Sequence, residues 1–164
     1  MSYELRALVA ASPVASRLAA RLPGSVAVPI SQGLALVPMA GPWLSELANS
    51  PPVFDELDDP QLSRELVALV EDVSRLGPIA YISIDEQSDM TWQGAAAWSE
   101  GTLSMPPEVQ HPGEARAPNG GPVLAALRRL GAEVDPTRSD FDDFGLYQRR
   151  RTVAWLEDPP KPSC

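Results

Sequence analysis

Two groups of carboxylates are the densest concentration of chemically active side chains in this sequence of 164 residues. In chain order they are Asp55, Glu56, Asp58 and Asp59, then Asp85, Glu86 and Asp89. Neighbouring carboxylates could hold a cation weakly or attract a basic protein, although most acidic runs are solvated surface or the start of a helix. The segment DEQSD lacks the ligand spacing and the glycine of an EF-hand. We predict a protein-binding surface with no metal or other cofactor, made of Asp55, Glu56, Asp58, Asp85, Glu86 and Asp89.

Histidine and cysteine, the usual residues of nucleophilic and metal chemistry, occur once each. His111 lies in a proline-rich stretch, a poor place to hold an imidazole for catalysis, and we expect it to be solvated. Cys164 is the last residue printed and we expect it to be inert. One cysteine and one histidine cannot complete a tetrahedral zinc site. A single cysteine also excludes an internal disulfide, which fits a reducing cytoplasm.

Two further patterns leave an enzymatic role open. Asn119-Gly120-Gly121 precedes a predicted helix and could offer backbone N–H groups to an anion, but it lacks the lysine of a P-loop. A pair of carboxylates, as in glycoside hydrolysis, needs no local motif. A small enzyme with a carboxylate-based site for an unidentified small molecule is therefore the alternative, and the scarcity of histidine and cysteine favours a non-enzymatic role.

The charge balance is acidic, with a net charge of −9 and a pI near 4.5. Binding to nucleic acid or to anionic membranes requires a basic surface, so we expect neither. The basic run Arg149-Arg150-Arg151 follows Asp140, Asp142 and Asp143, and the proximity predicts internal ion pairs. Twelve arginines against the single lysine Lys161, with many alanines and prolines, are typical of a GC-rich bacterial genome.

The start of the chain does not have the pattern of a secretory signal, because Glu4 and Arg6 interrupt it early. Residues 22–45 carry no charge, but four prolines argue against a membrane span. The apolar content of 44% is that of a globular protein. We expect a cytoplasmic protein with one domain over residues 1–158 and a flexible tail over 159–164.

The strongest predicted element is an amphipathic helix over residues 60–76. Asp59 is its expected N-cap, Pro60 its first residue and Gly77 its C-terminal stop. Its apolar side chains recur every three or four residues and should share one face: Leu62, Leu66, Leu69, Val70, Val73 and Leu76.

Two strands follow this helix, and the pattern predicts that they form a hairpin. Ile79–Ile84 is a β-branched run, Asp85–Asp89 is the predicted turn, and Trp92–Trp98 is the second strand. Its two tryptophans should share one face and pack on the helix, with an aromatic ligand platform as the alternative. Glu100-Gly101 predicts a tight turn into a third strand.

The other elements complete an α+β fold with a mostly antiparallel sheet. Residues 3–10 fit a strand or a helical turn, residues 26–30 and 34–37 fit a hairpin with Gly33 in the left-handed conformation, and residues 106–118 fit an exposed loop. Helices are expected after Ser12-Pro13, after Gly121-Pro122 and after Ser139, and Trp155 should dock near the end of the chain.

Three stretches of sequence form a joint pattern that covers Gly77 to Leu156: GPIAYISIDEQ with QGAAAWSEG, then GPVLAALRRLGAEV, then FDDFGLYQRRRTVAWL. Together they resemble a poorly characterised bacterial family of small acidic proteins, similar to the immunity proteins that neutralise partner toxins. The chain departs from that pattern after the first strand, where DEQSDM replaces a glycine-rich segment. The resemblance implies a protein partner and supplies no catalytic residue to carry over to this sequence. We therefore expect a non-enzymatic binding module, for example an immunity-type inhibitor of a toxin.

Overall fold

A computed structural model describes residues 2–47, 50–57, 59, 61–88, 90–115 and 117–157. Its centre is a six-stranded sheet in the order β2-β3-β1-β4-β5-β6, in which every pair of neighbours is antiparallel. The strands are β1 (Ser2–Ala11), β2 (Val28–Pro29), β3 (Leu34–Pro38), β4 (Ile79–Gln87), β5 (Met90–Ser99) and β6 (Thr102–Gln110). The helices are α1 (Ser12–Ala20), α2 (Trp43–Leu47), α3 (Arg64–Val73), α4 (Pro122–Arg129) and α5 (Thr152–Glu157). The short 3-10 helices are η1 (Ser31–Gly33), η2 (Asp55–Leu57), η3 (Asp142–Phe144) and η4 (Leu146–Gln148). The predicted α+β class is confirmed.

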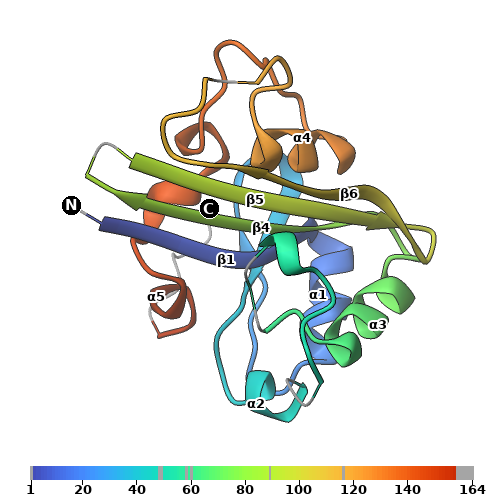
Figure 1. The fold of residues 1–164 in the computed structure, drawn as a ribbon. Coiled ribbons are helices and arrows are strands. Elements are labelled where there is room, and N and C mark those ends of the chain that lie inside the picture. The colour runs from blue at the N-terminus through green and yellow to red at the C-terminus, as the bar shows by residue number, and fades with distance from the viewer. Residues whose placement is uncertain are drawn as a thin grey trace.

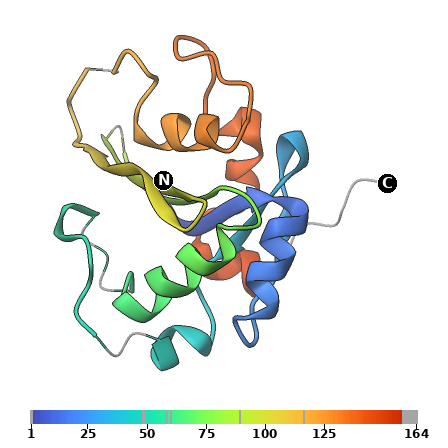
Figure 2. The ribbon, with the colours of Figure 1, turned by 90° about the vertical axis from the view of Figure 1, so that its right-hand side faces the viewer.

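Helices cover both faces of the sheet, and the two faces have separate apolar cores (Figures 1 and 2). On the first face, α1, α3 and η2 pack on Leu8, Tyr81 and Trp98. On the second face, α4 and the C-terminal segments pack on the alternate strand residues, such as Leu5 and Ile82. Burial on both faces explains why the second half of β1, residues 7–11, is a continuous apolar run, and why the sequence fitted a strand or a helical turn equally well.

The hairpin of β4 and β5 confirms the two predicted strands, but both are longer than expected. Asp85, Glu86 and Gln87 continue β4 as strand residues, so the predicted turn over 85–89 is wrong at its start. The turn after β5 is as expected, because Glu100 and Gly101 both have positive φ, 55° and 83°. Positive φ at both central residues gives the turn a backbone twist that matches the right-handed twist of the flanking strands.

The helix predicted over 60–76 is α3, and it is shorter at both ends. Its N-cap is Ser63, whose Oγ accepts a hydrogen bond from Leu66 N at 3.3 Å, so the prediction of Asp59 as N-cap is wrong. Asp59 is buried instead and accepts a hydrogen bond from the hydroxyl of Tyr81. A buried phenol needs an acceptor, and Asp59 supplies it. Leu76 follows the helix end and is 63% exposed, unlike the rest of the expected apolar face.

The loop predicted over 106–118 is wrong for its first five residues, which belong to β6. The register steps from Ala95 opposite Glu108 to Ala97 opposite Met105, so Pro106 and Pro107 lie opposite one residue. An edge strand tolerates proline at such a bulge because one side of its backbone has no ladder to complete.

In the C-terminal segments, α4 starts after Gly121 as predicted, and the segment after Ser139 forms the short 3-10 helices η3 and η4. The ion pairs expected between Arg149–Arg151 and the acids Asp140, Asp142 and Asp143 stay a prediction. Ser139 does not cap the helical turn; Asp140 and Asp143 do so reciprocally, each carboxylate accepting from the other's backbone N–H at 3.1 and 2.9 Å. Trp155 is fully buried, as expected. The predicted tail over 159–164 lies outside the described residues.

Candidate functional site

The first acidic cluster lies on η2, which is anchored on the first face of the sheet. Leu57 is fully buried, and its Cδ2 comes within 3.0 Å of where a Cβ on Gly94 would stand. Only glycine leaves room for η2 at this position of β5. Asp55 and Glu56, in the same turn, are exposed, while Asp58 lies outside the described residues.

The second acidic cluster is divided by the strand that carries it. Asp85 and Glu86 are consecutive residues of β4, so their side chains point to opposite faces of the sheet. Glu86 lies on the second face, where its carboxylate accepts from the Tyr147 hydroxyl at 2.6 Å and the Thr91 hydroxyl at 3.3 Å. Asp85 is exposed on the first face, and Asp89 lies outside the described residues.

Three of the predicted acids therefore share one face of the sheet. Asp85 is directly opposite Trp92 in the sheet. The Trp92 ring and Leu57 of η2 both come within 3.0 Å of where a Cβ on Gly94 would stand. Helix η2 therefore lies next to the Asp85–Trp92 pair. We call Asp55, Glu56 and Asp85 the acidic face.

An apolar groove of about 520 Å³ adjoins the acidic face. It lies between the segment that leads into η2, helix α3 and the hairpin of β5 and β6. Its apolar lining includes Pro52, Val53, Phe54, Val67, Trp98 and Leu103. Val53 and Leu103 are 43% and 39% exposed, and the Phe54 and Trp98 rings are 6.1 Å apart. Because Phe54 directly precedes Asp55, the groove continues into the acidic face.

A polar pocket of about 360 Å³ lies at the other end of the acidic face. Glu4 and Asp85 are opposite residues of β1 and β4, and both line it together with Arg6, Arg150 and Arg151. Like charges directly opposite one another repel. The positive charge of the three arginines that line the same pocket opposes this repulsion, and Arg6 also pairs with Asp59 at 3.5 Å.

The C-terminal segment holds Glu4 in place in this pocket. Glu4 Oε1 and Oε2 accept from the backbone N–H and the hydroxyl of Thr152, both at 2.8 Å. The backbone N–H of Glu4 donates to Arg150 O at 2.8 Å, and that of Arg6 donates to the Thr152 hydroxyl. Residues 150–152 therefore run along β1 where β3 has ended.

Glu4 and Arg6 are site residues that the sequence analysis did not identify. Their signal was the alternation in the stretch YELRA, where they sit between apolar residues and so share one face of a strand. Nothing in the sequence showed that Asp85 would be the residue opposite Glu4, since the pairing depends on the register of β1 against β4.

The helix α4 does not offer the free anion site that its glycines suggested. The N–H of Val123 donates to Gln93 Oε1, and that of Gly121 donates to Asn119 Oδ1, both at 3.0 Å. His111 is exposed just after β6. Over the described ranges, no group of three or more histidine, cysteine, aspartate or glutamate side chains is placed to hold a metal ion.

No helix within those ranges combines the length and the apolar composition that a membrane span requires. Comparison of the chain with protein-family models, with curated proteins and with solved structures finds no match.

Proposed function

We propose that this protein is a non-enzymatic binding module that engages a basic protein through the apolar groove and the acidic face, as an immunity-type inhibitor of a toxin does. The observation that supports the proposal is the continuity of the two surfaces, since Val53 and Phe54 lead directly into Asp55 and Glu56. Protein interfaces commonly combine an apolar centre with a polar rim.

The charge of the chain supports the choice of a basic partner. A net charge of −9 repels acidic proteins and attracts basic ones. A charged surface of this kind mainly raises the rate of association, by roughly ten-fold to a thousand-fold when the field is well focused. The groove would then supply the contacts that slow dissociation.

The test begins with the proteins encoded next to this chain's gene, expressed and measured for association with the purified protein. The variant D55N/E56Q/D85N removes the acidic face. Its association rate should fall about ten-fold or more at low salt, and the dependence of that rate on salt should flatten.

The matched control is E108Q/E114Q/E133Q, which removes three exposed acids outside the acidic face and changes the net charge equally. The control should keep most of the association rate. Equal losses of association rate in the two variants would show that the net charge of the chain, and not the acidic face, sets the rate. If none of the proteins encoded by neighbouring genes bound this chain, the proposal would be contradicted. An immunity role further requires that co-expression of this chain relieve the growth inhibition caused by the partner.

The small-enzyme alternative has one specific observation in its favour, the Glu4–Asp85 pair beside three arginines in the polar pocket. Both oxygens of Glu4 already accept hydrogen bonds from Thr152, which leaves Asp85 as the carboxylate of the pair that could contact a substrate. An enzyme of this kind would act on an anionic substrate, because guanidinium groups bind carboxylates and phosphates. A screen of phosphate and carboxylate esters should then detect turnover that D85N abolishes.

A further inference from the structure

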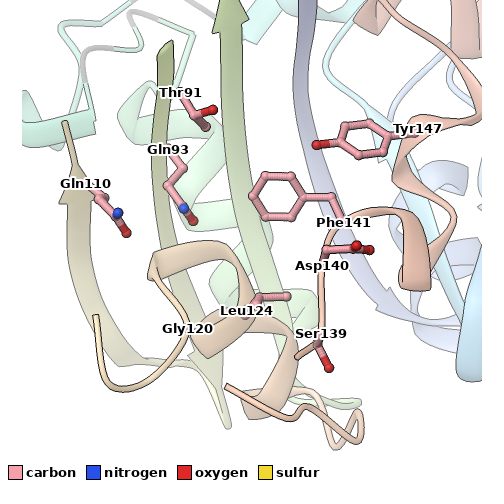
Figure 3. A pocket seen from close by; sticks show the side chains of 9 residues that line it. All are labelled: Thr91, Gln93, Gln110, Gly120, Leu124, Ser139, Asp140, Phe141 and Tyr147. Carbon is pink, nitrogen blue, oxygen red and sulfur yellow. The ribbon is translucent and has the colours of Figure 1, made fainter. Parts of the chain in front are cut away.

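A second pocket lies on the opposite face of the sheet, between the ends of β5 and β6 and the C-terminal segment (Figure 3). Its volume is about 230 Å³, the space of roughly seven or eight water molecules in the liquid. Drug-sized ligands occupy about 300–1,000 Å³, so this pocket suits a smaller molecule. Strand residues form one side, and Asp140, Phe141 and Tyr147 form the other.

Two glutamines form the polar side of this pocket. Gln93 and Gln110 are directly opposite one another in β5 and β6. Gln93 is 8% exposed, and its Oε1 accepts from the Val123 N–H at 3.0 Å, which determines which end of the amide is the oxygen. Its Nε2 makes no hydrogen bond to any described residue. The side chain therefore offers a free donor within a buried setting.

Gln110 offers the complementary group. Its Oε1 is buried and has no hydrogen-bond partner among the described residues. Its Nε2 is turned toward the carbonyls of Glu114 and Ala115, both at 3.5 Å, so the oxygen points away from them. A buried acceptor without a partner costs free energy, and native proteins rarely leave one. Gln93 thus leaves a donor unused and Gln110 leaves an acceptor unused, on opposite residues of β5 and β6.

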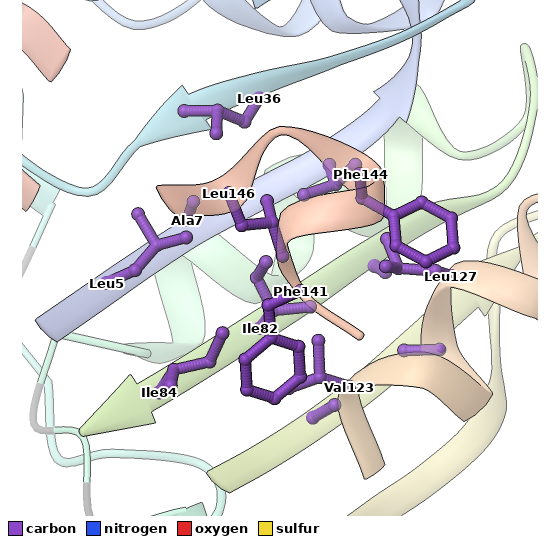
Figure 4. Packing of buried hydrophobic residues seen from close by; sticks show 14 of the residues in the cluster. Leu5, Ala7, Leu36, Ile82, Ile84, Val123, Leu127, Phe141, Phe144 and Leu146 are labelled. Carbon is purple, nitrogen blue, oxygen red and sulfur yellow. The ribbon is translucent and has the colours of Figure 1, made fainter. Parts of the chain in front are cut away.

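Gly121 makes room for both amides. A Cβ at this position would stand 2.8 Å from Gln93 Nε2 and 3.0 Å from Gln110 Oε1. Only a residue without a side chain leaves room for the two amides beside this backbone. The wall opposite is firmly placed, since Phe141 packs with Val123 and Ile82 in the core of this face (Figure 4).

The aromatic and charged groups narrow the class of ligand. The Phe141 and Tyr147 rings have centroids 6.1 Å apart and planes at 72°, so a planar ring that stacks on one of them meets the other at its edge. Asp140 is the carboxylate that lines the pocket, and no arginine or lysine is among the described residues that do so. Glu86 lies just beyond, bound to Tyr147 and Thr91. Such a pocket disfavours phosphate.

We propose that this pocket binds a small uncharged planar ring that carries an amide, of the size of a free pyrimidine base or nicotinamide. The ring accepts a hydrogen bond from Gln93 Nε2 and donates one to Gln110 Oε1. One face of the ring packs on Phe141 and its edge meets Tyr147. Asp140 Oδ1 accepts from the Asp143 N–H, which leaves Oδ2 for a further N–H at the mouth.

The experiment measures binding of uracil and nicotinamide by saturation-transfer NMR and by shifts of the side-chain amide signals. Fluorobenzene is the apolar ring of similar size, and uridine 5′-monophosphate is the phosphate-bearing probe. We expect at least one of the two amide rings to bind, with fluorobenzene and the nucleotide weaker by about ten-fold or more. Absence of binding by both amide rings, or equal binding of fluorobenzene, would overturn the proposal.

Two variants separate binding from folding. Q110L should weaken binding of the amide ring about ten-fold or more while leaving the thermal midpoint unchanged or higher, because it removes an unpaired buried acceptor. G121A pushes both amides out of their positions and should also weaken binding. Its matched control is G131A, which has a similar φ (94° against 104°) and no atom within 4 Å of the new Cβ. Unchanged affinity in Q110L, or equal affinity in G121A and G131A, would refute the site.

Discussion

At the scale of single residues, the least expected feature is the pair of buried residues Asp59 and Tyr81, joined by the partly exposed Arg6. Asp59 is 1% exposed, and its carboxylate lies 3.5 Å from the Arg6 guanidinium and accepts from the Tyr81 hydroxyl and the Gln61 N–H. A buried carboxylate is tolerated only when its oxygens are satisfied in this way. The group ties the segment after η2 to the centre of the sheet, and so helps to place the acidic face.

This group predicts a loss of stability in alkali. Burial, and then the neighbouring Asp59 carboxylate, raise the pKa of Tyr81 above its ordinary value near 10. Above that value the unfolded chain loses the phenolic proton while the folded protein keeps it. The stabilisation is therefore complete below about pH 10 and is lost as pH rises further, by about 1.4 kcal/mol per pH unit.

Tyr3 should contribute in the same direction, because burial also raises the pKa of its hydroxyl. Denaturant unfolding at a series of alkaline pH values would measure the combined slope. Y81F should lessen it and should also lower stability at neutral pH, by about 1–3 kcal/mol, because Asp59 loses a donor. An alkaline slope unchanged in Y81F would contradict this account.

At the scale of elements, α3 is held by packing more than by its own propensity. It has ten residues, and isolated helices of that length are marginal in water. Leu66, Val70 and Val73 are buried against the first face of the sheet, and the Ser63 cap satisfies one N–H at its start. The helix in turn forms one wall of the apolar groove, so its stability and the groove are linked.

The prediction at this scale is that L66A lowers the free energy of unfolding by about 2–5 kcal/mol, since a fully buried leucine leaves a cavity. L76A is the matched control on the same segment. Because Leu76 is 63% exposed, its loss should cost less than about 0.5 kcal/mol. Urea melts of both variants measure the difference, and similar midpoints would show that the leucine face does not support the fold.

At the scale of the whole molecule, the two edges of the sheet carry proline. Pro29 lies in the edge strand β2, and Pro106 and Pro107 form the bulge of β6 at the other edge. Proline at an edge withholds the N–H that another chain's strand would need, and a bulge twists the edge away. This arrangement protects the two edges of the sheet from pairing with further copies.

We predict that P106T/P107V increases self-association. The substituted residues could complete a regular edge ladder, which would then be open to pairing with other copies. Light scattering over a concentration series should show larger species than for the wild-type protein. P112T, an exposed proline beyond the strand, is the control and should leave scattering unchanged. Equal scattering from all three proteins would show that the edge is protected by other means.

The sequence by itself determined the features that depend on neighbours along the chain. The three- and four-residue spacing around Leu66, the turn at Glu100-Gly101 and the left-handed Gly33 follow from backbone sterics and from periodicity, which act within a few residues.

Only the tertiary structure decided where the polar side chains lie and which groups they bond to. Asp59 has the local pattern of an N-cap, yet its carboxylate accepts a hydrogen bond from the buried hydroxyl of Tyr81, 22 residues away. Asp85 and Glu86 read as one cluster, but the extension of β4 sends them to opposite faces. Gln93 and Gln110 become neighbours only through the register of β5 and β6. The physical reason is the same in each case: a buried donor or acceptor must find a partner wherever the packed elements bring one, and that position has no local signature.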